Sequence, residues 1–244
     1  MAVDLTDIQT LHVKMNDNAP NNVVTNDGTG TLTLTSINAT TQSMSVPGKI
    51  NTAFDFDSVD ERIQGGYDAS LDTAAGSIAF WAIKDGTATN KDCVFSFYNT
   101  AVTSQFNARL YMVPPHRLNL GGTAIGAAYI DTALFDGTDW VHVVITQDGG
   151  VQGLKVYLNG VDTPLDSNTI GTNWISTETY EHLSIGARVG GDTLLDGSLD
   201  DFRIFNQALT QDEVDFLYND GNGTELNAPP LVLVDKRTYN FGIH

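Results

Sequence analysis

Short β-rich segments, several with strict alternation of apolar and polar residues, recur along the first half of the chain. They are "TLTLTSI" at 31–37, "AFDF" at 53–56, "SIAFWAI" at 77–83, "CVFSFY" at 93–98 and "NARLYMV" at 107–113. Alternation places successive side chains on opposite faces of a strand. Dipeptides that favour tight turns are spread along the chain, with Asp-Gly at 27, 85, 136, 148, 196 and 220 and Asn-Gly at 159. The pattern predicts an antiparallel all-β protein.

The clearest hairpin lies in residues 140–160. Its first arm places Trp140, His142, Val144 and Thr146 on one face and Val141, Val143 and Ile145 on the other. After a turn at Asp148-Gly149, the second arm alternates Leu154, Val156 and Leu158 with Lys155 and Tyr157. Hairpins of this kind predict a β-sandwich of two stacked sheets, with functional loops at the rim.

One helix follows residue 209, because several helix signals agree there. Thr210 is the expected N-cap, and Glu213 three residues later completes a capping box. Leu209 and Val214 form the expected hydrophobic staple, and Gly221 follows the expected end, after about three turns. Residues 223–244, which include Pro229-Pro230 and the apolar run "LVLV", are predicted to be a linker with a final strand or docking tail.

Composition narrows the function classes. The 244 residues are 41% apolar and 17% charged, and 12 basic against 30 acidic residues give 12 − 30 = −18. This charge argues against nucleic acid or an anionic membrane as partner, and no apolar run is long enough for membrane insertion. Cys93 is the only cysteine, which excludes an intrachain disulfide, and the first 20 residues lack the pattern of a secretory signal peptide.

The segment "GSLDDFRIFNQALTQDEVDFLYNDG" at 197–221 resembles the terminal motif of laminin-G-like domains of the concanavalin A-like superfamily. Weaker pieces match in the family's order, and they extend the resemblance over about residues 8–222: "LHVKMNDNAPNNVVTNDGTG", "VPGKINTAFDFDSVDERI" and "WVHVVIT…LKVYLNG". The resemblance implies one jelly-roll sandwich over residues 1–222. Domains similar to this one bind carbohydrates or proteins, often carry calcium, and occur in enzymes, surface proteins and bacteriophage virions.

Two adjacent aspartates interrupt the apolar strand in this motif. Alternation places Asp200 on the same face as Phe202 and Ile204, so we expect a buried carboxylate that is paired, hydrogen-bonded, metal-bound or protonated. The resemblance implies a structural calcium ion, with Asp27 as a second ligand, although Thr25 stands where relatives commonly have an aspartate. The alternative is a carboxylate satisfied by backbone N–H groups or an arginine.

Other acidic residues have simpler interpretations. Asp201 lies on the same face as Arg203 and is its expected partner. A further acidic cluster in "FDFDSVDERI" could bind a second cation, but acidic residues around a hairpin are more often solvated.

A sugar site needs an exposed aromatic face with polar groups beside it. We expect Trp81 and Trp140 to pack in the core and Trp174, in a loop, to be freer. The candidate ligand-binding residues are Trp174, Tyr180, Arg188 and Asp192. Each of these residue types is also common in packing or on plain surface.

No catalytic pattern is present in the sequence. Glucanases of this superfamily carry E-x-D-x-x-E on a strand, whereas the nearest match here, Glu213-Val214-Asp215, lies on the predicted helix with Tyr218 in place of the second glutamate. We therefore expect a non-catalytic, carbohydrate-binding adhesion module in a virion or outside the cell. The alternative is a structural virion protein that binds neighbouring subunits or copies of itself through residues 223–244. A glycoside hydrolase is the third hypothesis.

Overall fold

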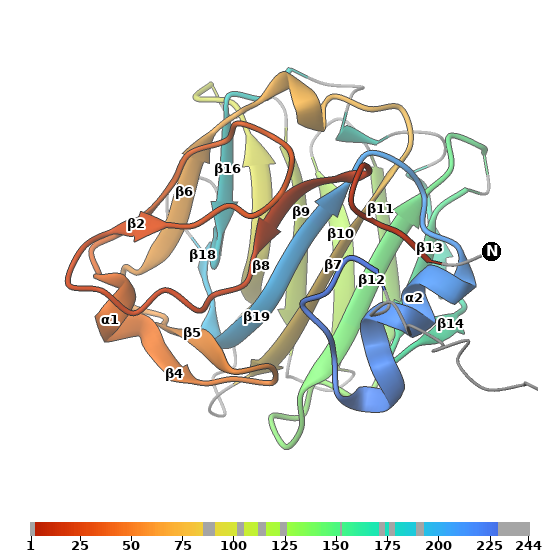
Figure 1. Ribbon diagram of the computed structural model, residues 1–244. Coiled ribbons are helices and arrows are strands. Elements are labelled where there is room, and N and C mark those ends of the chain that lie inside the picture. The colour runs from red at the N-terminus through yellow and green to blue at the C-terminus, as the bar shows by residue number, and fades with distance from the viewer. Residues whose placement is uncertain are drawn as a thin grey trace, which may run out of the picture.

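Two antiparallel β-sheets lie face to face, with one helix on the outside of the first sheet (Figure 1). The structure is a computed structural model that describes residues 3–84, 91–101, 105–111, 116–122, 126–151, 153–170, 174–175, 179–188 and 193–228. This arrangement confirms the predicted β-sandwich of two antiparallel sheets.

The first sheet has eight strands. In spatial order they are β14 (Val161–Thr163), β13 (Lys155–Leu158), β12 (Val141–Gln147), β7 (Gly76–Lys84), β19 (Asp196–Phe205), β5 (Thr52–Asp57) and β4 (Ser45–Pro47), with β1 (Gln9–Val13) also paired to β19. The long strand β19 therefore pairs with three neighbours.

The second sheet has nine strands. Their order is β15 (Ser167–Asn168), β11 (Gly126–Asp131), β10 (Arg117–Gly122), β9 (Gln105–Tyr111), β8 (Lys91–Tyr98), β16 (His182–Ile185), β6 (Arg62–Gly66), β3 (Leu34–Ile37) and β2 (Val23–Val24). A separate pair joins β17 (Ala187–Arg188) to β18 (Thr193–Leu194). The short helical elements are α1 (Thr41–Met44) and 3-10 turns at Ala69–Leu71 and Asn219–Gly221.

The main core lies between the two sheets. Phe80 of β7 and Phe202 of β19 meet Phe95 of β8, with ring centroids 6.3 and 5.8 Å from that of Phe95. Val143 and Ile145, which share one face of the predicted hairpin, lie in this core. Burial of these apolar side chains, worth about 1.5–3 kcal/mol each, holds the layers together.

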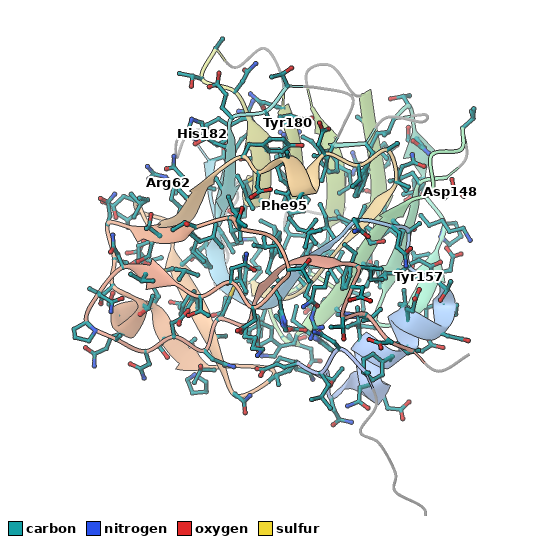
Figure 2. The ribbon with its side chains drawn as sticks, turned by 45° about the horizontal axis from the view of Figure 1, so that its top comes forward. Arg62, Phe95, Asp148, Tyr157, Tyr180 and His182 are labelled. Carbon is teal, nitrogen blue, oxygen red and sulfur yellow. The ribbon has the colours of Figure 1, made fainter. Side chains whose placement is uncertain are left out.

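A second apolar cluster lies on the outer face of the eight-stranded sheet, under helix α2 (Gln211–Tyr218). Val214 and Leu217 of the helix pack near Tyr157 of β13, which Figure 2 shows beside α2. The Glu213 carboxylate accepts a hydrogen bond of 2.6 Å from the Thr210 N–H, as expected of a capping box. The helix ends at Tyr218, earlier than predicted.

None of the described helices is long and apolar enough to span a membrane.

Asn219 rather than Gly221 ends the helix. Its φ of 49° and ψ of 55° place it in the left-handed region, and its N–H donates to the Asp215 carbonyl. Asparagine tolerates this conformation better than most residues because its short polar side chain can bond locally. The glycine that marked the expected end lies in the following 3-10 turn.

Strand β19 changes partner at its two aspartates. Residues 196–199 pair with β5, whereas residues 202–205 pair with β1, and the register against β7 shifts between Asp200 and Arg203. Asp201 takes a φ of 51°. The extra residue of this β-bulge reverses the alternation, so Leu199 and Phe202 both reach the main core.

The expected orientation of Asp200 was therefore wrong. Asp200 lies opposite Trp81 of β7 and accepts a hydrogen bond from the Ile50 N–H, so it faces the outside of the eight-stranded sheet and not the Phe202 and Ile204 side. It is nevertheless fully buried, as the sequence predicted.

Arg203 is the centre of a buried polar network. Its Nη2 lies 3.0 Å from Asp201 Oδ1, which confirms the expected pair, and His12 Nε2 lies 2.7 Å from the same oxygen. Burial acts to raise the pKa of Asp201, but Arg203 and His12 outweigh it and hold that pKa below its usual value. Asp201 is therefore an ionised carboxylate in the protein interior.

The same guanidinium holds the chain after the helix. It donates to the backbone carbonyl of Thr224, and Nη1 lies 3.3 Å from Asn227 Oδ1. The Leu5 N–H donates to the Asn227 carbonyl over 2.7 Å. Residues 224–227, in the segment expected to be a linker, thus lie against the sandwich, whereas "PPLVLV" at 229–234 falls outside the described residues.

We expect Arg203→Met to lower the free energy of unfolding by about 3–5 kcal/mol, because it leaves the Asp201 carboxylate buried without its cation. Thermal unfolding at pH 7 measures this effect. The matched control is Arg117→Met, since Arg117 pairs with Asp131 at half-exposed positions, where an ion pair contributes about 1 kcal/mol or less. Equal shifts for the two variants would contradict the assigned role of Arg203.

Candidate functional site

A row of small and polar residues crosses the outer face of the nine-stranded sheet. Each residue lies directly opposite the next on the neighbouring strand, from β11 to β3: Ala127, Gly121, Asn107, Ser96, Ser184, Gln64 and Thr35. Six steps between strands span about 29 Å, because paired strands lie about 4.8 Å apart. The other outer face is covered by α2, so this row distinguishes the two sides of the sandwich.

Several polar atoms on this face are buried without a hydrogen-bond partner in the described part of the chain. They are Gln105 Nε2, Asn107 Oδ1, Arg109 Nε and Ser184 Oγ. The Gln105 and Asn107 side chains are only 1% and 2% exposed. An unsatisfied buried polar group costs about 1–3 kcal/mol, which a ligand supplying the missing hydrogen bond would recover. This face therefore carries buried polar atoms that are unsatisfied within the described chain.

Two shallow pockets lie along the face. The first has a volume of about 420 Å³ and contains Gln105, Asn107 and Arg109 of β9 with Arg188 of β17. The second, of about 370 Å³, lies around Thr35, Gln64 and His182; Figure 2 labels His182. Both volumes are in the range of small-ligand sites, and their described lining contains no carboxylate.

Arg188 is the one sequence-predicted ligand residue that the structure places in this site. Its Nε and Nη2 lie 3.2 and 3.0 Å from Gln105 Oε1. Gln105, Asn107 and Arg109 were missed by sequence reasoning, because alternation marks them only as polar strand positions. Their burial comes from the neighbouring strands and cannot be read from the segment itself.

The predicted aromatic platform has a different role. Trp174 is 1% exposed and packs on Phe106 at a ring distance of 5.5 Å, and Tyr180 is 4% exposed against Phe97 at 5.8 Å. The expectation that Trp174 is freer than Trp140 was wrong, since Trp140 is half-buried. Rings enclosed in the core cannot stack on a ligand. Asp192 lies outside the described residues.

Asp200 lies in a site on the opposite outer face. Its Oδ2 accepts from the Ile50 N–H over 2.7 Å, and its Oδ1 is buried with no hydrogen-bond partner in the described chain. Burial raises the pKa of Asp200 to about 8, and the nearby carboxylates of Asp201 and Glu225 act in the same direction. Either a proton or a cation bound to Oδ1 would neutralise the buried charge of this carboxylate and satisfy its unpaired oxygen.

Asp27, the expected second ligand, is paired with a lysine. It is 41% exposed and its carboxylate lies 3.1 Å from Lys14 Nζ, while Thr25 Oγ1 donates to Asp17 over 2.6 Å. Within the described ranges, no three His, Cys, Asp or Glu side chains come together as a metal site. The free Oδ1 fits a cation, but one carboxylate is a poor donor set for calcium, which takes six to eight oxygens. Calcium stays a prediction that rests on Asp200.

Comparison with known proteins agrees with this architecture. A family model described as the concanavalin A-like lectin/glucanases superfamily matches residues 57–215, more than half of the chain. The chain belongs to this superfamily. A search of curated proteins found no match for this concanavalin A-like chain.

Solved structures share the fold at low sequence identity. The receptor binding domain of botulinum neurotoxin D has a TM-score of 0.63 at 14% identity over 89% of this chain and 54% of its own. The binding domain of Paraclostridial Mosquitocidal Protein 1 has a TM-score of 0.60 at 14% identity over 89% and 53%. The concanavalin A-like chain thus spans about half the length of these toxin domains.

A third structure matches over its whole length. Domain 4 of the extracellular arabinanase AbnA from Geobacillus stearothermophilus, solved in complex with arabinotriose, has a TM-score of 0.60 at 19% identity. The match covers 92% of this chain and 100% of that domain. At these identities the similarity establishes the fold.

We predict that Asp200→Asn changes how stability depends on pH. With a folded pKa of about 8 against a usual 3.8, wild-type Asp200 holds a proton that the unfolded chain releases above pH 4. Wild-type stability therefore falls as pH rises towards 8, and the uncharged amide of the variant removes this loss. From pH 5 to pH 8, the variant should gain about 3–4 kcal/mol relative to wild type in urea unfolding, since each pH unit over which only the folded state holds the proton is worth about 1.4 kcal/mol. If the difference in unfolding free energy between the variant and the wild type is the same at every pH, the raised pKa is contradicted.

The same variant tests calcium at Asp200. A bound ion requires the ionised carboxylate, so 1 mM calcium at pH 7.5 should raise the melting temperature of the wild type and EDTA should lower it. Asp200→Asn should respond to neither. If neither calcium nor EDTA changes the melting temperature of the wild type, Asp200 does not bind calcium.

Proposed function

We propose that this chain is a non-catalytic carbohydrate-binding module that holds its ligand on the outer face of the nine-stranded sheet. The observation that carries the proposal is a set of buried polar atoms on this face, at Gln105, Asn107 and Ser184, that have no hydrogen-bond partner among the described residues. Sugars present many hydroxyl groups, each both a donor and an acceptor, and such groups match a surface of this kind.

The shape of the face supports an oligosaccharide rather than a single sugar. The two pockets lie at opposite ends of the row, one around β9 and the other around β6, with β8 and β16 between them. Three strand steps separate β9 from β6, which is about 14 Å. Between the pockets Ser96 and Ser184 are fully buried, and Ser96 Oγ donates to the Ala187 carbonyl of β17, so a ligand that fills both pockets would pass outside β17.

The relatives also support sugar or receptor binding. The arabinanase domain was solved with arabinotriose, and the two toxin structures are binding domains. These ligands and roles belong to those proteins. They favour the same class of activity here, in an extracellular setting, because the polar face is present independently of the comparison.

The proposal excludes glycoside hydrolysis. Retaining hydrolases place two carboxylates about 5 Å apart at the bond they cleave, whereas the described lining of both pockets has none. Glu213 and Asp215, the nearest match to a glucanase motif, lie on α2 on the other side of the sandwich. Glu213 there bonds the N-cap, and the Asp215 carboxylate accepts from Gln211 over 2.7 Å.

We expect Asn107→Ala to weaken glycan binding about tenfold or more, because one hydrogen bond to the ligand is worth about 1.5 kcal/mol. The measurement is a glycan array that includes arabino-oligosaccharides, followed by calorimetry on the strongest hit. Stability should not fall by more than about 1 kcal/mol, since Asn107 Oδ1 makes no bond to lose in the described chain.

Asn222→Ala is the matched control, because Asn222 is exposed beyond α2 on the other side of the sandwich. This variant should bind like the wild type. Equal binding by Asn107→Ala and wild type, or an array without any hit, would contradict the proposed face.

A further inference from the structure

The pocket around Gln105 has a charge opposite to that of the whole chain. Its described lining consists of Gln105, Asn107, Arg109, Gly121, Gly122, Gly126, Ala127, Thr169 and Arg188. Two of these nine residues are arginines and none is acidic, although the chain carries 30 acidic and 12 basic residues. The described lining of the pocket therefore carries two cationic side chains and no carboxylate, on an acidic protein.

Arg188 also fixes which atom Gln105 presents. Both Arg188 nitrogens donate to Gln105 Oε1, at 3.2 and 3.0 Å, which identifies that atom as the amide oxygen. The other amide atom, Nε2, is thus a donor, and it has no partner among the described residues. The arginine contact turns a residue that could donate or accept into a donor.

Arg109 adds a second unpaired donor. Its Nη2 lies 3.0 Å from Asn119 Oδ1 on the adjacent strand β10, while its Nε is buried without a partner in the described chain. Among the described lining residues, Asn107 Oδ1 is the buried side-chain acceptor without a partner. Two unpaired donors beside two guanidinium groups favour a ligand rich in acceptor oxygens and negative in charge.

We propose that this pocket binds an anionic sugar residue of the glycan, one that carries a carboxylate or a sulfate. The anionic group accepts from Gln105 Nε2 and Arg109 Nε next to the Arg188 charge, and a ring hydroxyl donates to Asn107 Oδ1. This inference rests on the proposed function and adds the chemical class of the ligand. The net charge of −18 disfavours a long polyanion, so the anionic residue is an isolated one in a largely neutral chain.

The test compares sugars that differ only in the charged group. Calorimetry at 20 mM NaCl uses three pairs: trigalacturonate and its carboxyl-reduced form, 3′-sialyllactose and lactose, and 6-sulfated and unsulfated N-acetyllactosamine. In at least one pair, the acidic member should bind about tenfold tighter or more, as expected for hydrogen bonds to a charged group. This preference should shrink at 300 mM NaCl, because salt screens the attraction. The pair that responds identifies carboxylate or sulfate.

Variants assign the preference to the pocket. Arg109→Gln and Arg188→Gln should each lower the ratio of the affinities for the acidic and neutral members of a pair from about tenfold to near one. Arg117→Gln is the matched control. Arg117 lies on β10, two residues before Asn119 and on the same face of that strand, but it pairs with Asp131 and is not among the described lining residues of the pocket. It should keep the preference.

The outcomes separate this inference from the proposed function. Equal binding of acidic and neutral members, with Asn107→Ala still weakening both, would overturn the anionic specificity and leave carbohydrate binding standing. If none of the six sugars binds and the glycan array gives no hit, both the anionic specificity and the proposed carbohydrate binding are overturned. Binding of inorganic sulfate as tight as that of the sulfated sugar would also overturn the inference, because it would show an anion site that does not recognise the sugar.

Discussion

The architecture depends on a charged network inside strand β19. The strand is buried along nine of its ten residues and contacts β7, β5 and β1, so its side chains need partners on both sides. At the point where β5 gives way to β1, Asp201 adopts a left-handed conformation and pairs with Arg203 and His12. Buried charges are tolerated when fully paired. This network joins the first strand, the last strand and residues 224–227.

The bulge also separates the two sides of the molecule. It allows Leu199 and Phe202 to reach the main core while Asp200 is buried under residues 48–50. With α2 and the segment after it, these elements cover the outer face of the eight-stranded sheet. The outer face of the nine-stranded sheet carries the unpaired polar groups instead. Structural roles and the proposed binding role are therefore on opposite sides of the sandwich.

The proposed recognition relies on strand residues rather than on an aromatic platform. Gln105, Asn107 and Arg109 occupy alternate positions of one strand, and cross-strand neighbours hold them in place. Groups on strands are positioned more rigidly than groups on loops, so the hydrogen-bonding pattern is preorganised. Trp174 and Tyr180 support this face from inside the core, where they pack on Phe106 and Phe97 behind the polar side chains.

The sequence by itself determined the all-β class, the hairpin of β12 and β13, the capped helix and the family, because each follows from local alternation or from contiguous motifs. It also identified the Asp201–Arg203 pair. Tertiary structure alone decided the side on which Asp200 lies, since one left-handed residue reverses alternation. It likewise decided that Trp174 is buried and that Gln105 and Asn107 line one pocket. Burial and unpaired atoms depend on strands distant in sequence, which no local pattern records.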